Sequence, residues 1–276
     1  MPRRVWTRPA SCAASRTPSA WRPASSSPEP FGRSSLVKSR ADQLLVERGL
    51  FESRARAQAA IAAGLVTANG AAVRKASEMI AADAEITAQA PHPYVSRGGL
   101  KLAAALDAFG FDPTGLTCLD VGASTGGFTD LLLQKGAAHV VAVDVGRDQL
   151  HASLRADARV TSLEGRDIRT LAAEDMPRPA TLAAIDVSFI SLKLVLPAVA
   201  ALLAPQAAVA ALIKPQFEAG RAALKKGIVR DEAVRAAVCE DIAALVAGLG
   251  FRVLGPIPSP IAGGDGNLEF LIGGVR

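Results

Sequence analysis

The feature that most constrains this sequence is a glycine-rich segment, residues 122–128 (GASTGGF), that directly follows an apolar run over residues 116–121. The sequence then predicts a helix over 129–135 and a second apolar strand over 140–145, which contains Asp144 near its end. Small residues between a strand and a helix let the backbone approach a ligand closely, and a carboxylate ending the next strand can bind ribose hydroxyls. The pattern predicts an α/β domain with a Rossmann-like, mostly parallel sheet that binds a nucleoside-containing ligand.

Length and charge divide the chain into parts. Its 276 residues suit one large and one small domain, and 50% of them are apolar, enough for a sizeable core. The net charge of +5 is misleading, because residues 1–38 hold seven Lys/Arg against Glu29 alone and the remainder sums to −1. Only local placement of Arg and Lys can therefore indicate nucleic-acid binding.

Two further features bear on the compartment. Cys12, Cys118 and Cys239 show no C-x-x-C spacing, which favours a reducing cytoplasm and predicts neither a disulfide nor a metal site. Residues 194–213 are uncharged over twenty positions, long enough for a membrane span. They contain two prolines and much alanine, so we favour a helix, a turn at 204–206 and a buried strand.

Composition predicts four segments. Residues 1–38 are rich in Arg, Ser and Pro, and we expect a disordered leader or an extension from a misplaced start, although the composition loosely resembles a transit peptide. Residues 39–90 predict a small α+β domain, residues 91–95 a stiff Pro-containing linker, and residues 96–276 the large domain.

The small domain has clear boundary signals. A helix over 41–48 should end at Gly49, and a second helix, capped by Ser53, should run over 54–63 to Gly64. A short strand over 65–68 then meets Asn69-Gly70, a strong hairpin signal.

The pattern S-R-x-x-A-x-x-x-I-x-x-G-x-V followed by N-G resembles the alpha-L RNA-binding motif. That resemblance implies that Arg54 and Arg56, at the start of the second helix, contact RNA phosphates. The patch could extend to Arg48, Arg74 and Lys75. The alternative is an ordinary solvated surface, since six bases balance six acids over residues 39–95.

The string D-V-G-A-S-T-G-G-F-T resembles the first motif of FtsJ-type RNA ribose methyltransferases, which implies S-adenosylmethionine as the cofactor. By this resemblance Asp144 contacts the donor's ribose and Asp167 its adenine; a helix N-cap is the alternative role for Asp167. The remaining donor-binding residues would be Asp120, Gly122, Ala123, Ser124, Gly126, Gly127 and Phe128.

Polar residues follow two apolar runs of the large domain: Asp186 ends the run 182–185 and Lys214 ends the run 207–213. Because the carboxyl ends of adjacent parallel strands converge, both side chains should face the donor. With Lys101 and Glu269 they resemble the K-D-K-E tetrad of FtsJ-type 2′-O-methyltransferases. The strings S-R-G-G-x-K-L, D-V-S-F-I-S-L, L-I-K-P-Q-F-E and G-N-L-E-F-L resemble more narrowly the TlyA family.

The TlyA resemblance covers residues 40–274 and implies a cytidine 2′-hydroxyl in ribosomal RNA as substrate. Lys214 would be the base, Asp186 its partner, and Lys101 and Glu269 would position the substrate. A membrane-active, haemolysin-like protein and a non-catalytic RNA-binding protein are the alternatives. Four cations after Phe217 could grip RNA or belong to a solvated loop; they are Arg221, Lys225, Lys226 and Arg230.

Overall fold

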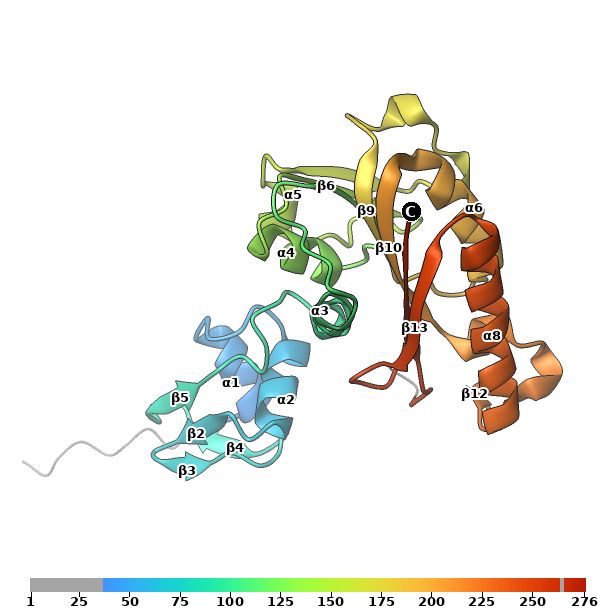
Figure 1. Cartoon of the computed structure of the whole chain (residues 1–276). Coiled ribbons are helices and arrows are strands. Elements are labelled where there is room, and N and C mark those ends of the chain that lie inside the picture. Colours follow the sequence, from blue (N-terminus) through green and yellow to red (C-terminus); the bar gives the residue numbers. More distant parts are fainter. Residues whose placement is uncertain (1–36, 264–265) are drawn as a thin grey trace, which may run out of the picture. The chain divides into compact units, whose positions relative to one another are not determined.

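The computed structural model describes residues 37–263 and 266–276, so the leader predicted for residues 1–38 lies almost wholly outside the described part. The chain forms two compact units, residues 1–89 and residues 90–276 (Figure 1). We call them the N-terminal unit and the C-terminal unit and describe each by itself.

In the N-terminal unit, two helices pack on short antiparallel strands. The helices are α1 (Ala41–Glu47) and α2 (Arg54–Ala62). A three-stranded sheet has the order β3-β2-β5, and a separate pair joins β1 to β4. The strands are β1 (Lys38–Arg40), β2 (Val66–Ala68), β3 (Ala71–Ala72), β4 (Met79–Ala81) and β5 (Ile86–Ala88).

The two helices of this unit end within one residue of where the sequence predicted. The Oγ of Ser53 accepts a hydrogen bond from the backbone N–H of Arg56 at 3.4 Å, as an N-cap does. Gly49 and Gly64 follow the two helices with φ of 70° and 73°, a conformation that side-chain-bearing residues disfavour. Asn69 and Gly70 both have positive φ and form the tight β2–β3 turn.

The C-terminal unit is built on a seven-stranded sheet of order β13-β14-β10-β9-β6-β7-β8. Strands β10, β9, β6, β7 and β8 run parallel, while β14 is antiparallel to both of its neighbours, β10 and β13. This mostly parallel α/β sheet confirms the predicted fold class. The strands are β6 (Thr117–Val121), β7 (His139–Asp144), β8 (Val160–Glu164), β9 (Ala180–Ile185), β10 (Leu203–Ile213), β13 (Arg252–Pro258) and β14 (Phe270–Val275).

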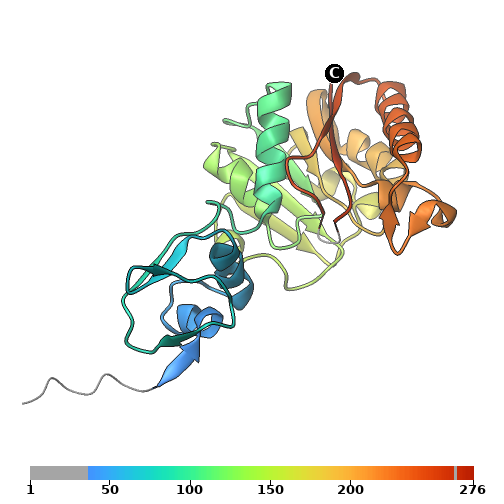
Figure 2. The same ribbon diagram turned by 90° about the horizontal axis from the view of Figure 1, so that it is seen from below.

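Helices cover both faces of this sheet and create two cores (Figures 1 and 2). Strand β10 serves both: Val209, Ala211 and Ile213 pack with α6 and α8, whereas Ala210 and Leu212 pack with α3 and α4. Burial on both faces explains why the strand is a continuous apolar run. The helices are α3 (Gly98–Phe109), α4 (Gly127–Gln134), α5 (Ala152–Arg155), α6 (Leu192–Leu202) and α8 (Glu232–Gly248).

The turn predicted at residues 204–206 is wrong, because α6 ends at Leu202 and β10 begins directly at Leu203. The ladder to β9 is irregular between Leu203 and Ala208, where Pro205 is exposed. A proline is tolerated there because no regular ladder hydrogen bond is required of it. Among the described residues, no helix is long and apolar enough to cross a bilayer.

Short elements connect β10 to α8. They are α7 (Pro215–Glu218), the 3-10 turn η3 (Arg221–Ala223) and a two-stranded hairpin of β11 (Leu224–Lys225) and β12 (Ile228–Val229). The sequence predicted only a loop in this region.

Candidate active site

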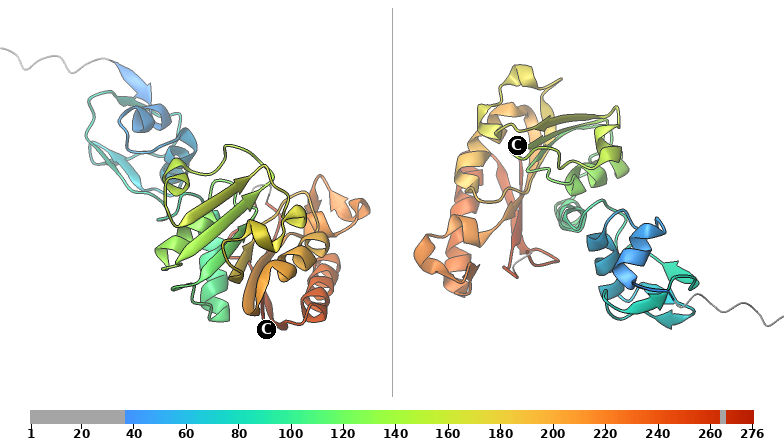
Figure 3. Two further views of the ribbon diagram at one scale, coloured as in Figure 1. Left: turned by 90° about the horizontal axis from the view of Figure 1, so that it is seen from above. Right: turned by 180° about the vertical axis from the view of Figure 1, so that it is seen from behind.

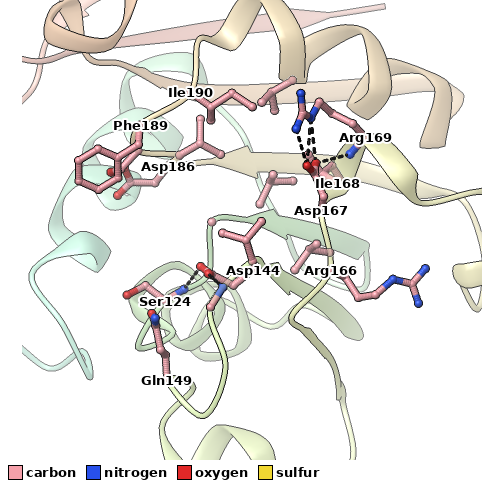
Figure 4. A pocket seen from close by; sticks show the side chains of 18 residues that line it. Ser124, Asp144, Gln149, Arg166, Asp167, Ile168, Arg169, Asp186, Phe189 and Ile190 are labelled. Carbon is pink, nitrogen blue, oxygen red and sulfur yellow. Dashed lines mark hydrogen bonds and ion pairs between the residues drawn. The ribbon is translucent and has the colours of Figure 1, made fainter.

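A cavity of about 600 Å³ opens at the carboxyl ends of β6, β7 and β9. Ser124 and Asp144 lie at one side of it, and Asp186, Phe189 and Ile190 lie at the opposite side (Figure 4). The Asp144 carboxylate accepts the backbone N–H of Ser124 at 2.8 Å and that of Gly146 at 2.7 Å. These two bonds hold the carboxylate at the cavity wall, and each oxygen keeps further capacity to accept from a ligand hydroxyl. We call this cavity the donor pocket.

Gly122 shows why the turn above β6 needs small residues. Its φ is 85°, and a Cβ atom there would meet the backbone carbonyl oxygen of Asp186 at 2.5 Å. Strand pairing explains this close approach, because Val121 is aligned with Ile185 in the β6–β9 ladder. A larger residue at 122 would push apart the two strand ends that wall the donor pocket. This cradle and the Asp144 carboxylate fit the nucleoside half of S-adenosylmethionine.

Asp120 has a supporting place below this turn. It is fully buried, lines neither the donor pocket nor the second cavity described below, and accepts hydrogen bonds from the backbone N–H (2.9 Å) and Oγ1 (2.6 Å) of Thr129 in α4. Burial, with the nearby carboxylates of Asp186 and Asp144, raises the pKa of Asp120 to about 7 against the opposing effect of the Thr129 bonds. The two bonds to Thr129 therefore hold the first turn of α4 against the end of β6.

The other predicted donor residues fall into two groups. Gly122, Ser124, Asp144 and Asp167 line the donor pocket. Ala123, Gly127 and Phe128 line a second cavity of about 260 Å³, together with Gly122, Ser124 and the segment 96–98, while Gly126 lines neither. Asp186 is the one acidic residue that lines both cavities.

Asp167 fills one of the two roles that the sequence left open. It is the N-cap of the 3-10 turn η1 (Ile168–Thr170), where its side chain accepts the backbone N–H of Arg169 at 2.9 Å. It also forms an ion pair with the Arg169 guanidinium at 2.6 Å, which lowers the pKa of the carboxyl group. The capping role is seen directly, and the adenine contact stays a prediction.

The four tetrad residues form two ion pairs. Lys214 Nζ lies 2.6 Å from Asp186 Oδ1, and it also donates to Ser188 Oγ at 2.8 Å. Lys101 Nζ, from the first turn of α3, lies 2.5 Å from Glu269 Oε2. Both lysines and Glu269 are buried. Burying charges is costly and seldom serves stability alone, so two such pairs at the strand ends indicate a site for chemistry.

Sheet register explains this meeting. In the antiparallel β10–β14 ladder Ile213 is aligned with Phe270, so the next pair outward is Lys214 and Glu269. In the parallel β10–β9 ladder Ala211 is aligned with Ile185, which brings Ser188 level with Lys214. Three strand ends thus supply the site, and α3 adds Lys101.

Sequence reasoning missed several residues here. Ser188 binds Lys214, and Ser96 and Arg97 line the second cavity beside Asp186. Phe189 is 91% exposed with φ of 64°, and its ring centroid lies 5.1 Å from that of Phe217. Strand pairing could have indicated Ser188, whereas an exposed aromatic ring leaves no periodic signal. Among the described residues, no group of three or more His, Cys, Asp or Glu side chains is placed to hold a metal ion.

In the N-terminal unit, the predicted RNA-binding cations have partners of differing kinds. Arg48 donates to the backbone carbonyls of Ala82 and Ala84. Arg54 lies 2.8 Å from the buried carboxylate of Asp42, and Arg56 lies 3.4 Å from Glu52. The side chains of Arg74 and Lys75 are exposed. Arg48 and Arg54 thus tie the unit together, and RNA contact by all five cations stays a prediction.

Comparisons with known proteins agree with this geometry. The FtsJ-like methyltransferase family matches residues 94–276, and the S4 domain matches residues 39–86. The Bacillus subtilis protein named "Putative rRNA methyltransferase YqxC" is 48% identical over 241 residues, 85% of each chain. The Mycobacterium tuberculosis "16S/23S rRNA (cytidine-2′-O)-methyltransferase TlyA" is 41% identical over 238 residues, covering 85% of this chain and 89% of the relative.

Among solved structures, a "Putative hemolysin" from Streptococcus thermophilus is 45% identical, with a TM-score of 0.69 over 87% of this chain and 88% of that one. The family matches span both units, and the strand-end pairs lie within the FtsJ-like region. The chain belongs to the TlyA group of the FtsJ-like methyltransferase family, and it is an S-adenosylmethionine-dependent methyltransferase with an S4 domain in front.

Proposed function

We propose that this enzyme transfers a methyl group from S-adenosylmethionine to the 2′-hydroxyl of a cytidine in ribosomal RNA, in the cytoplasm. The observation that carries the proposal is the Lys214–Asp186 pair, because Asp186 lines both the donor pocket and the second cavity. A group held there lies between the donor and an acceptor. The names of the relatives support ribosomal RNA and cytidine as the substrate.

When bound, the donor supplies an electrophilic methyl group on a sulfonium. The Asp144 carboxylate binds the donor's ribose hydroxyls, and Gly122 leaves room for the donor against the strand ends. As the 2′-oxygen forms its new bond to the methyl carbon and the carbon–sulfur bond of the donor breaks, the 2′-hydroxyl would pass its proton to Lys214 Nζ. Asp186 and Ser188 orient Lys214 and stabilise the ammonium that results.

The second pair acts on the acceptor. Glu269 holds Lys101 Nζ at 2.5 Å, and the remaining N–H donors of that ammonium can bind oxygens of the target nucleotide. Glu269 and Lys214 come next to each other where the β10–β14 ladder ends, so the target nucleotide is held beside the amino group of Lys214. Alignment of oxygen, methyl carbon and base contributes much of the rate in such transfers.

Product analysis tests this proposal. The full chain is incubated with labelled S-adenosylmethionine and ribosomal RNA lacking the modification, and the RNA is digested to nucleosides for mass spectrometry. We expect the label in 2′-O-methylcytidine. Label on a nucleobase, or on another nucleoside, would contradict the proposed acceptor, and no label in any RNA would contradict RNA methylation.

A further inference from the structure

Four cations cluster in the segment between α7 and α8, residues 221–230, which we call the basic hairpin. No acidic residue occurs within 221–230, and Asp231, which follows, caps α8 by accepting the backbone N–H of Ala233. Among the residues that the structure describes, none of the four cations lies within 4 Å of a carboxylate, and all four are exposed. They are Arg221, Lys225, Lys226 and Arg230. Four other arginines of this unit are each paired with a carboxylate, whereas these four cations lie together on one short segment without such a partner; the paired ones are Arg155, Arg159, Arg166 and Arg169.

The backbone that carries these cations is held in place. Lys226 and Gly227 have φ of 53° and 80°, the conformation of a tight two-residue hairpin turn. Val229 is buried at the base of the hairpin, and Arg235 of α8 donates to the carbonyl oxygens of Val229 (3.1 Å) and Arg230 (2.8 Å). This anchoring separates the segment from a solvated loop without defined structure.

A single buried amide ties the hairpin to the catalytic edge. Asn267, 2% exposed, accepts the backbone N–H of Val229 at 3.2 Å and donates to the carbonyl oxygen of Gly227 at 3.0 Å. Two residues later in the chain is Glu269, the partner of Lys101. At its other end the hairpin follows Lys214 through the short helix α7. Both ends of the hairpin are thus connected to tetrad residues.

The views agree on where the hairpin lies within the C-terminal unit. Figures 2 and 3 show it in orange, projecting from the body of this unit beyond the start of α8. A projecting pair of lysines on a fixed turn can reach the phosphates of a bulky nucleic acid, whereas a small substrate would occupy the cavities alone.

We propose that the basic hairpin docks the phosphate backbone of the RNA next to the target nucleotide, and that Asn267 is the positioning residue that fixes the hairpin relative to Lys214 and Glu269. This inference rests on the proposed function, since it requires an RNA substrate. Phosphate contacts set the register of a nucleic acid without reading its sequence. Because the hairpin is held at a fixed distance from Lys214, its contact with the phosphates selects which ribose along the strand is methylated.

Charge removal at the hairpin is the first test. Lys225→Gln with Lys226→Gln is compared with Lys135→Gln plus Arg178→Gln, exposed residues that precede the amino ends of β7 and β9. Both double variants lose the same charge. We expect the hairpin variant to raise the Kd for ribosomal RNA about tenfold and to lower the salt slope by about 1–2, with donor affinity unchanged. Equal RNA affinity and salt slope in the two double variants would overturn the inference.

The role of Asn267 is tested by a double-mutant cycle on RNA affinity. Asn267→Ser is combined with the two lysine substitutions, and melting curves check that each variant folds. If Asn267 positions the hairpin, the combined loss of affinity is smaller than the sum of the separate losses, because displaced lysines contribute little. Additive losses would overturn the positioning role. Wild-type protein that fails to methylate RNA at all would instead contradict the proposed function.

Discussion

Each unit of this protein contains an aspartate with no exposed surface, and the surroundings of the two carboxyl groups shift their pKa values in opposite directions. In the N-terminal unit, Asp42 accepts from Arg40 (3.0 Å), Arg54 (2.8 Å) and Gln58 (2.8 Å), and chiefly the Arg40 bond keeps the pKa of the carboxyl far below its usual range. In the C-terminal unit, no described cation forms an ion pair with Asp120, and burial raises its pKa to about 7.

The difference shows what each carboxylate does. Asp42 is neutralised within the fold, so it links α1 to α2 and leaves no unbalanced charge. Asp120 lies near Asp186 and Asp144, and its Oδ1 finds no hydrogen-bond partner among the described residues. The buried carboxylate thus stabilises the N-terminal unit, whereas in the C-terminal unit Asp120 lies near two carboxylates that line the donor pocket.

The largest effect should come from substitution of Lys214 in the Lys214–Asp186 pair, which should lower the rate of methyl transfer without unfolding the protein. We expect Lys214→Ala and Lys214→Arg to bind donor and RNA but to lose about 10²–10⁴-fold in turnover, the usual range for a positioned general base. Arginine fails because its guanidinium does not release a proton near neutral pH. Single-turnover methyl transfer measures the loss.

The matched control is Lys193→Ala, which removes an exposed lysine paired with Asp241 at 2.8 Å and should retain full activity. Near-normal turnover in Lys214→Arg would mean that Lys214 only stabilises charge and that another group accepts the proton.

Asp42→Asn should cause the second largest effect, and it should act on stability. The substitution leaves Arg40 and Arg54 without a countercharge, but their side chains are 39% and 52% exposed, so solvent screens the loss and the cost should lie below the about 3–5 kcal/mol of a fully buried pair. The N-terminal unit should therefore unfold at lower denaturant concentration while donor binding to the C-terminal unit persists. Limited proteolysis and donor titration separate the two readouts, and unaltered protease resistance would contradict the cohesive role of Asp42.

Asp120→Asn should have a smaller effect of opposite sign that depends on pH. The pKa rises from 3.8 unfolded to about 7 folded, so the folded state keeps a proton that the unfolded state has lost between these values. The free energy of unfolding of the wild type therefore falls as pH rises from about 4 to 7 and then levels off. The amide removes this penalty, since it still accepts from Thr129.

The stabilisation by Asp120→Asn should be largest above pH 7, on the order of a few kcal/mol at 1.36 kcal/mol per pKa unit, and should vanish near pH 4. Thermal melts at several pH values measure it. A stabilisation that does not change with pH would show that Asp120 is ionised in the folded protein throughout this range.

The smallest effect should come from two cations of the N-terminal unit, the half-buried Arg56 and the exposed Arg74. Arg56→Gln with Arg74→Gln should weaken RNA binding several-fold and lower its salt slope by about 1–2, without changing donor affinity. Arg54 is left intact because it holds Asp42. RNA titrations at several salt concentrations provide the measurement, and an unchanged slope would place the S4 domain's RNA contacts elsewhere.

Local signals in the sequence predicted the local structure well. Ser53 caps a helix, Gly64 ends it and Asn69-Gly70 forms a turn, because each depends only on the backbone conformation of a few adjacent residues. The convergence of Asp186 and Lys214 was also predictable, since both end parallel strands of one sheet. The start of β10 was misplaced because Pro205 suggested a turn in a region where the strand is irregular.

Partners distant in the chain were not predictable from patterns. Lys101 and Glu269 are 168 residues apart and meet only because β14 pairs with β10. Arg54 was predicted from its helix position to face RNA, and the pattern carried no sign that Asp42 holds its guanidinium. The basic hairpin depends in the same way on the side chain of Asn267, some forty residues away.

The place of β14 in the sheet also has a consequence for the timing of synthesis. This strand is later in the chain than β13 and β10, yet it lies between them and completes the ladder that aligns Glu269 with Lys214. Domains begin to fold as they emerge from the ribosome, at about 5–20 residues per second. The N-terminal unit can therefore fold early, whereas the methyltransferase site stays incomplete until residues 269–275 have been translated and have inserted between two strands made before them. A nascent chain still lacking those residues could hold RNA without being able to modify it.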